Sequence, residues 1–190
     1  MIGNSLAGIY GTGAPPIPPS SFESIATVTA SGGETSLSFT SIASTYKSLQ
    51  IRGLSRRADS GTTISTDALR FNSDTAANYT THRLSGDGAT ATAGGNGGAT
   101  EIVFSRGAGA TATAGIFGAV IADIIDYAST TKYKTVRSLT GFDINGPGGN
   151  IYLYSGAWLS TSAITSITIY ANGNTIAAGE TYALYGIKGE

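Results

Sequence analysis

The chain contains one histidine, His82, and a catalytic Ser-His-Asp relay would have to be built on it. His82 lies in the segment NYTTHRL, where a place on the polar side of a strand or between subunits is the commoner role. No G-x-S-x-G nucleophile elbow surrounds any serine. We therefore predict that the protein is not an enzyme.

Oxygen-bearing side chains at Asp123, Asp126, Asp143 and Asn145 are the best candidates for metal ligands. Calcium takes six or more oxygen ligands, and the chain has no D-x-[DN]-x-[DN]-G loop. Zinc sites use cysteines or several histidines, and the chain has no cysteine. We expect these side chains to cap loops and to pair with nearby lysines and arginines, and we predict neither a metal ion nor another cofactor.

Three aromatic residues, Tyr152, Tyr154 and Trp158, are close together in the segment IYLYSGAWL. On a strand, Tyr152 and Tyr154 would share one face, and aromatic rings can stack on sugars. These three residues are therefore the candidate glycan-binding residues. The alternative is that they fill the core and an interface, as large aromatic side chains usually do.

Charged residues make up 12% of the chain, about half of what an average globular protein contains. Eleven Lys and Arg against twelve Asp and Glu give a net charge of −1, which argues against nucleic acid or an anionic membrane as a partner. The first residues do not have the pattern of a signal peptide, and no run of 18 apolar residues follows. A surface of small, uncharged side chains loses little entropy when it is covered, so it suits contact between subunits.

Residues 1–21 differ from the rest of the chain, because they contain four of the five prolines and no charged side chain. Proline restricts the backbone to extended conformations, so we expect an extended arm that does not fold alone. Its apolar and proline residues need a partner surface to cover them. The predicted partner-binding residues are Ile2, Leu6, Ile9, Tyr10, Pro15, Pro16, Ile17, Pro18 and Pro19. A tail without a role is the alternative.

Residues 22–190 are predicted to form a single all-β domain. Short runs rich in Ile, Val, Thr, Tyr and Phe show the alternation of a half-buried strand, and Gly, Asn, Asp and Ser separate them. The predicted strands span 22–30, 35–41, 47–56, 67–73, 79–85, 101–106, 115–124, 134–141, 150–156, 163–171 and 181–188. The segments Gly86–Thr100 and Gly107–Gly115 lack large side chains and are predicted to be loops.

Several strings, taken in their order along residues 21–190, resemble small structural proteins of tailed-bacteriophage virions. They are SFESIATV (21–28), YKSLQIRG (46–53), LRFNSD (69–74), NYTTHRL (78–84), FGAVIADIIDYASTTKYKTVRSLTGFD (117–143), SGAWLSTSAITSITIY (155–170) and ALYGIKG (183–189). The resemblance implies a jelly-roll-like antiparallel β-sandwich within an assembled virion. It supplies no catalytic residues and does not cover the proline-rich arm.

These observations together predict a bacteriophage virion structural protein that is made in the host cytoplasm and located in the phage particle. The specific expectation is a capsid cement or decoration protein. Its arm and sandwich would pack on the major capsid protein, and its copies would associate with one another as a homotrimer. A tail or fibre subunit and a carbohydrate-binding module for host surface glycans are the alternatives.

Overall fold

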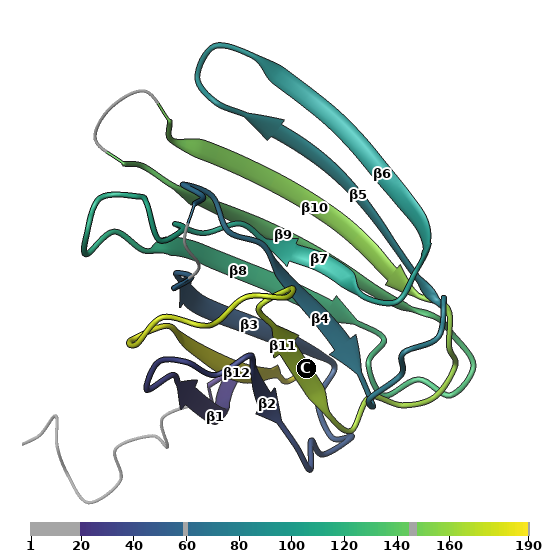
Figure 1. Cartoon of the computed structure of the whole chain (residues 1–190). Helices are drawn as coiled ribbons and strands as arrows, with labels where there is room; N and C mark the ends of the chain where they lie inside the picture. Colours follow the sequence, from purple (N-terminus) through teal and green to yellow (C-terminus); the bar gives the residue numbers. More distant parts are fainter. Residues whose placement is uncertain (1–19, 59–60, 145–147, 190) are drawn as a thin grey trace, which may run out of the picture.

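The computed structural model describes residues 20–58, 61–144 and 148–189, which form two antiparallel β-sheets and contain no helix. The larger sheet has eight strands in the order β1 (Phe22–Thr29), β12 (Thr181–Ile187), β3 (Ser48–Ser55), β8 (Gly118–Ile125), β9 (Lys134–Phe142), β10 (Asn150–Trp158), β5 (Tyr79–Gly86) and β6 (Ala91–Ala99). The smaller sheet has four strands in the order β2 (Ser36–Phe39), β11 (Ile167–Tyr170), β4 (Asp67–Phe71) and β7 (Ile102–Ser105). Figure 1 shows the smaller sheet in front of one face of the larger one, in the manner of a sandwich.

The prediction of an all-β chain is confirmed, and each predicted strand position contains a strand. The predicted alternation is present in part: Leu49 and Ile51 of β3 are buried and Arg52 is exposed, but Gln50 is buried as well, where it is hydrogen-bonded to Asp123 and Arg52. Side chains of a strand point alternately to the two faces of its sheet, so burying one face fixes this pattern.

The prediction of a loop over Gly86–Thr100 is wrong. Most of that segment is strand β6, which pairs with β5 to form a hairpin at the edge of the larger sheet. The side chains of β6 are small, and all but the last are exposed, so no burial pattern marks the strand in the sequence. Backbone hydrogen bonds to β5, which do not depend on side-chain type, hold it in place. The segment Gly107–Gly115 contains no strand, as predicted, apart from isolated bridges at Ala108.

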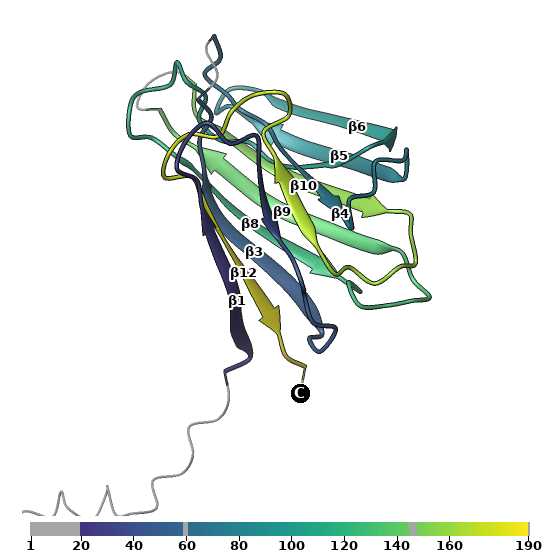
Figure 2. The same ribbon diagram turned by 60° about the horizontal axis from the view of Figure 1, so that its bottom comes forward.

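Residues 1–19 lie outside the described residues, and with them all of the predicted partner-binding residues of the arm. Of the predicted arm, Ser20 and Ser21 are described, and both are exposed. They lead directly into β1, an edge strand of the larger sheet, and Figure 2 shows β1 and β12 side by side. The arm therefore remains a prediction whose point of attachment is an edge of the larger sheet.

The main hydrophobic core lies between the two sheets and contains a group of packed aromatic rings. The Trp158 ring stacks on Tyr79 at a centroid distance of 6.3 Å and meets Phe71 at 5.6 Å. The Trp158 indole Nε1 donates a hydrogen bond of 2.7 Å to Asp74 Oδ2, so its polar atom is satisfied as well. Large rings at this end of the core hold β5, β10 and β4 together.

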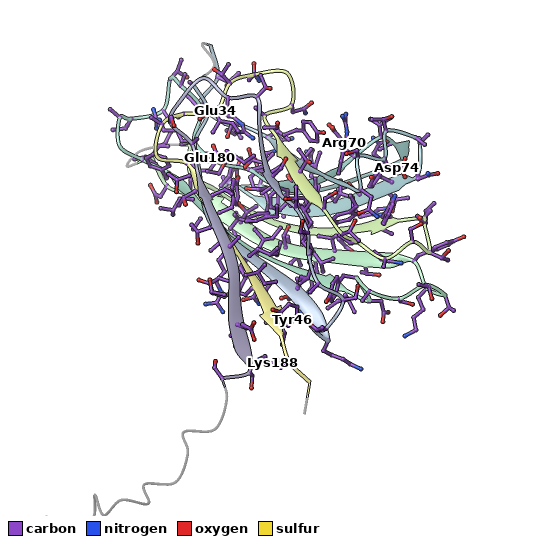
Figure 3. The ribbon with its side chains drawn as sticks, turned by 90° about the horizontal axis from the view of Figure 1, so that it is seen from below. Glu34, Tyr46, Arg70, Asp74, Glu180 and Lys188 are labelled. Carbon is purple, nitrogen blue, oxygen red and sulfur yellow. The ribbon has the colours of Figure 1, made fainter. Side chains whose placement is uncertain are left out.

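One carboxylate, that of Glu23 in β1, links the first and last strands with the loop before β3. Glu23 Oε1 accepts a hydrogen bond of 2.9 Å from the Tyr46 hydroxyl, and Glu23 Oε2 lies 2.6 Å from Lys188 Nζ. Figure 3 shows Tyr46 and Lys188 close together. These contacts tie the first and last described strands to the loop before β3.

Candidate interaction surfaces

The face of the larger sheet that points away from the smaller sheet carries large aliphatic side chains in exposed positions. Ile121, Leu139, Leu153 and Leu84 lie directly opposite one another on β8, β9, β10 and β5. They are exposed to 39%, 47%, 47% and 54%, respectively. We call this row the aliphatic ridge. A row of large apolar side chains that water covers is costly unless a partner shields it.

A hollow of about 1080 Å³ lies beside the aliphatic ridge on the same face. Its floor includes Ala119 and Gly141, which stand in register between the exposed side chains of Leu54 and Ile151, and Gly86, which pairs with Ile151 on the far side. Because these floor residues have a methyl group or no side chain, the surface is low there. The outer face thus combines a raised apolar row with a depression next to it.

A polar row runs along the other side of the ridge. Gln50 Nε2 donates a hydrogen bond of 2.8 Å to Asp123 Oδ1, and an Arg137 guanidinium nitrogen lies 3.0 Å from Asp123 Oδ2. Ser155 and His82 continue this row on β10 and β5. No hydrogen bond joins Ser155 to His82, and Asp123 is three strands away from His82. The described contacts of His82 are therefore not those of a catalytic relay.

The predicted oxygen ligands are dispersed. Asp123 belongs to the polar row, and Asp126 pairs with Lys132 at 3.2 Å. Asn145 lies outside the described residues. Within residues 20–58, 61–144 and 148–189, no group of three or more His, Asp or Glu side chains is placed to hold a metal ion.

The three candidate glycan-binding aromatics lie on the inner side of β10 and are buried. The Tyr152 and Tyr154 rings stack on each other with centroids 5.8 Å apart, and Trp158 belongs to the main core. Their ring faces are therefore used within the protein. Tyr154 lines a cavity together with residues that the sequence did not single out.

That cavity has a volume of about 650 Å³ and lies where the larger sheet extends beyond strand β7 of the smaller sheet. It contains the side chains of Arg83, Arg106, Thr81 and Tyr154, and glycines of β6 form part of its wall. The residues come mainly from β5, β6, β10 and the ends of β7. Strands β5, β6 and β7 follow one another in the sequence, and the pairing of β10 with β5 adds Tyr154 from a distant part of the chain.

A buried group of charges lies elsewhere, between β3, β4 and β12. The Arg57 guanidinium binds Glu180 with nitrogen–oxygen distances of 3.0 and 3.2 Å, and its other terminal nitrogen contacts Asp67. Asp67 also accepts hydrogen bonds from the Ser55 and Tyr182 hydroxyls. All these side chains are buried, and none lines one of the cavities described above. The cluster therefore belongs to the packed interior of the described chain.

One guanidinium faces two carboxylates in this cluster, and this imbalance makes stability depend on pH. Burial, with the adjacent Asp67 carboxylate, raises the pKa of Glu180 from its usual 4.5 to about 8. The folded chain then keeps a proton on Glu180 up to about pH 8, which the unfolded chain releases near pH 4.5. The stability that this proton contributes is thus fully present below pH 4.5 and is lost as the pH rises towards 8. We expect unfolding at pH 8 to cost on the order of 3 kcal/mol less than at pH 5.

Urea unfolding of the wild-type chain at several pH values between 5 and 8 measures this slope. Glu180→Gln keeps the shape and removes the titration, so its stability should change little over the same range. Glu34→Gln is the matched control: Glu34 caps exposed backbone N–H groups of Ser31 and Gly32, and its substitution should leave the slope unchanged. Figure 3 shows both glutamates towards one end of the sandwich. A flat wild-type profile would contradict the assignment.

Comparisons with protein-family models, with curated proteins and with solved structures find no match for this chain. Among the described residues, no helix has the length and apolar character needed to cross a membrane. The assignment of a function therefore depends on the two surfaces described above and on the sequence itself.

Proposed function

We propose that this chain is a structural subunit of an assembled particle and that it packs against further copies of itself through the outer face of its larger sheet. The aliphatic ridge is the observation that carries this proposal. Four large side chains in register, each roughly half exposed, form a continuous apolar row whose burial is favourable.

The size of the outer face supports a second copy as its occupant. Eight strands about 4.8 Å apart, with roughly eight residues of about 3.3 Å each, give a face of roughly 34 by 26 Å. Its area is close to the ~800 Å² per partner that a stable protein–protein interface buries. Two such faces would stack about 10 Å apart, as the sheets of a sandwich do.

The shape of the outer face also supports a second copy as its occupant, because the aliphatic ridge and the hollow beside it are complementary in shape. In a two-fold contact the aliphatic ridge of each copy would face the hollow of the other. In a three-fold ring, as in the expected homotrimer, the ridge of one copy would enter the hollow of the next. Asp123 and Arg137 beside the ridge supply charges of both signs, so the face can offer an opposite charge to either charge of a second copy.

The particle in question is, in this proposal, a bacteriophage virion, and the chain is a cement or decoration protein on its capsid. The resemblance of the sequence strings to small virion proteins supports this, and so does the order of the strands. When the β5–β6 and β9–β10 hairpins are set aside, the first strand pairs with the last, β2 with β11, β3 with β8, and β4 with β7.

Such nested pairing is what a long antiparallel ribbon gives when it is rolled into two sheets, so we propose a jelly-roll topology with two added hairpins. Jelly rolls occur in viral capsid proteins and in lectins. In the capsid proposal the proline-rich arm, which leads out of edge strand β1, binds the major capsid protein.

Self-association is tested with Leu139→Glu, which places a carboxylate in the middle of the aliphatic ridge. The wild-type chain should form oligomers, and the variant should associate at least about tenfold more weakly, which corresponds to ~1.4 kcal/mol. Light scattering behind a sizing column, over a range of concentrations, gives the mass and the oligomer number. Since Leu139 is half exposed, the fold of the variant should lose no more than ~1 kcal/mol.

Tyr133→Glu is the matched control, because Tyr133 is also exposed and apolar but lies in the loop between β8 and β9. It should leave the mass unchanged. A wild-type chain that stays monomeric at high concentration would overturn the self-association proposal. The virion assignment has its own test: electron microscopy of purified particles that contain the chain should show many copies on the capsid shell. Copies confined to the tail would favour the tail-subunit alternative.

A further inference from the structure

The cavity beside β7 lies on the inner face of the larger sheet, opposite to the aliphatic ridge. Alternation along β5 puts Thr81 and Arg83 on the inner face and His82 and Leu84 on the outer face. The smaller sheet ends at β7, and the residues of β6 beyond it are exposed in the described part of the chain. A volume of about 650 Å³ is in the range of small-molecule sites.

Two guanidinium groups line this cavity. Arg83 is exposed and makes no hydrogen bond or ion pair with the described residues. Arg106 is half-buried, and its Nε donates a hydrogen bond of 3.2 Å to the Tyr154 hydroxyl. Its terminal nitrogens have no hydrogen bond to the described residues. Glu101 also lines the cavity, but it is paired with Arg70 at 3.0 Å, so the unpaired charge in the cavity is positive.

Hydroxyl and amide groups surround the guanidinium groups. Thr81 is more than nine-tenths buried, and its Oγ1 has no hydrogen-bond partner within the described residues. Buried hydroxyls normally have a partner, so this atom lacks something that a ligand can supply. Burial raises the pKa of Tyr154, so its hydroxyl group stays protonated. It can therefore donate a hydrogen bond to a ligand while its oxygen accepts one from Arg106. Asn96 and Asn172 add amide groups to the wall.

We propose that this cavity binds a saccharide that carries a carboxylate, with Arg83 and Arg106 on the carboxylate and with Thr81 and Tyr154 on sugar hydroxyls. Guanidinium groups bind carboxylates through paired N–H donors, and a sugar ring presents the hydroxyls that single donors and acceptors match. The glycines of β6 leave the wall low, so that a ring can lie against the backbone.

The binding site proposed here goes beyond the structural function and does not depend on it, because the two surfaces lie on opposite faces of the sheet. It also differs from a site that stacks a sugar on Tyr152 or Trp158, whose rings are buried. Tyr154 takes part through its hydroxyl group and not through its ring face.

Calorimetric titration of the full chain with D-glucuronate, D-glucose, acetate and inorganic phosphate tests the proposal. Glucuronate should bind with a saturable millimolar or tighter affinity, and the other three compounds should bind at least tenfold more weakly. Arg83→Ala, at an exposed position, should weaken glucuronate binding at least tenfold without changing the melting temperature. Lys132→Ala removes an exposed cation that does not line the cavity, and it should leave binding unchanged.

Thr81→Val tests whether the unpartnered hydroxyl belongs to a binding site or is only a packing defect. Valine has the shape of threonine and lacks the unpartnered hydroxyl, so the melting temperature should stay the same or rise, while glucuronate binding should weaken. Absence of saturable glucuronate binding would overturn the proposal. So would equal binding of acetate or phosphate, which would make the cavity a simple anion site, and so would binding that both Arg83→Ala and Thr81→Val leave intact. None of these outcomes would bear on self-association through the aliphatic ridge.

Discussion

Replacement of Arg57 by methionine is expected to lower the free energy of unfolding by about 3–5 kcal/mol at neutral pH. Arg57 is almost fully buried, and its guanidinium is the positive partner of both Glu180 and Asp67. It also donates a hydrogen bond of 2.9 Å to the backbone oxygen of Tyr170. Methionine fills a similar volume but leaves the Asp67 carboxylate buried without a counter-charge and the Glu180 carboxyl group without its hydrogen-bond donor, and this desolvation is the source of the loss.

Urea unfolding monitored by tryptophan fluorescence measures this loss. Arg137→Met is the matched control, because Arg137 also pairs with a carboxylate, that of Asp123, but is largely exposed. Exposed ion pairs contribute only about 0–1 kcal/mol, so this variant should be close to the wild type. Adding Asp67→Asn to Arg57→Met removes the orphaned charge and should restore part of the stability. Equal stabilities for Arg57→Met and Arg137→Met would show that the buried cluster does not have the importance assigned to it.

The strands could be predicted because the two faces of most of them meet different surroundings. In β3 and β11, residues of one parity face the core and are aliphatic, while the others are mostly polar, and the period of two appears directly in the sequence. The turn at Asn172–Asn174 was equally readable: Asn172 and Gly173 have φ angles of 45° and 88°, the left-handed region that asparagine and glycine tolerate.

In strand β10 the sequence pattern does not indicate which face is buried. In IYLY both parities are large and apolar, with Tyr152 and Tyr154 facing inward and Ile151 and Leu153 exposed on the outer face. No local pattern tells which parity is buried, because that depends on which face the smaller sheet covers. The aliphatic ridge was missed for the same reason: its members come from four strands that are adjacent only after the sheet has formed.

The cavity was missed because its signal is spread along the chain. Arg83, Arg106 and Tyr154 are separated by 23 and 48 residues in the sequence and meet through the pairing of β10 with β5 and the position of β7. The glycine-rich stretch of β6, interpreted as a loop, was the one local indication that this part of the cavity wall has almost no side chains. Predicting this site would have required the register of the hairpin, which side chains as small as those of β6 do not specify.

Trp158→Ala is the second substitution with a large expected effect, a loss of about 3–5 kcal/mol in the free energy of unfolding. The indole is 2% exposed, stacks on Tyr79 and donates a hydrogen bond to Asp74 Oδ2, so alanine would leave a cavity and remove one of the two side-chain hydrogen bonds to that oxygen. Trp158→Phe keeps an aromatic ring in place and removes the N–H donor, and it should cost clearly less. Because both variants lack the one tryptophan of the chain, far-ultraviolet circular dichroism must follow their unfolding.

This stability loss decides how sugar binding should be tested. If Trp158 held a glycan on an exposed ring, Trp158→Ala would abolish binding at little cost in stability. In the described fold the same substitution weakens the core, so lost binding would report unfolding as readily as lost contact. Arg83 is exposed and free of partners in the described chain, so its removal leaves the core untouched. A stable Trp158→Ala variant that had lost glucuronate binding would therefore contradict both the core position of Trp158 and the site assigned to Arg83.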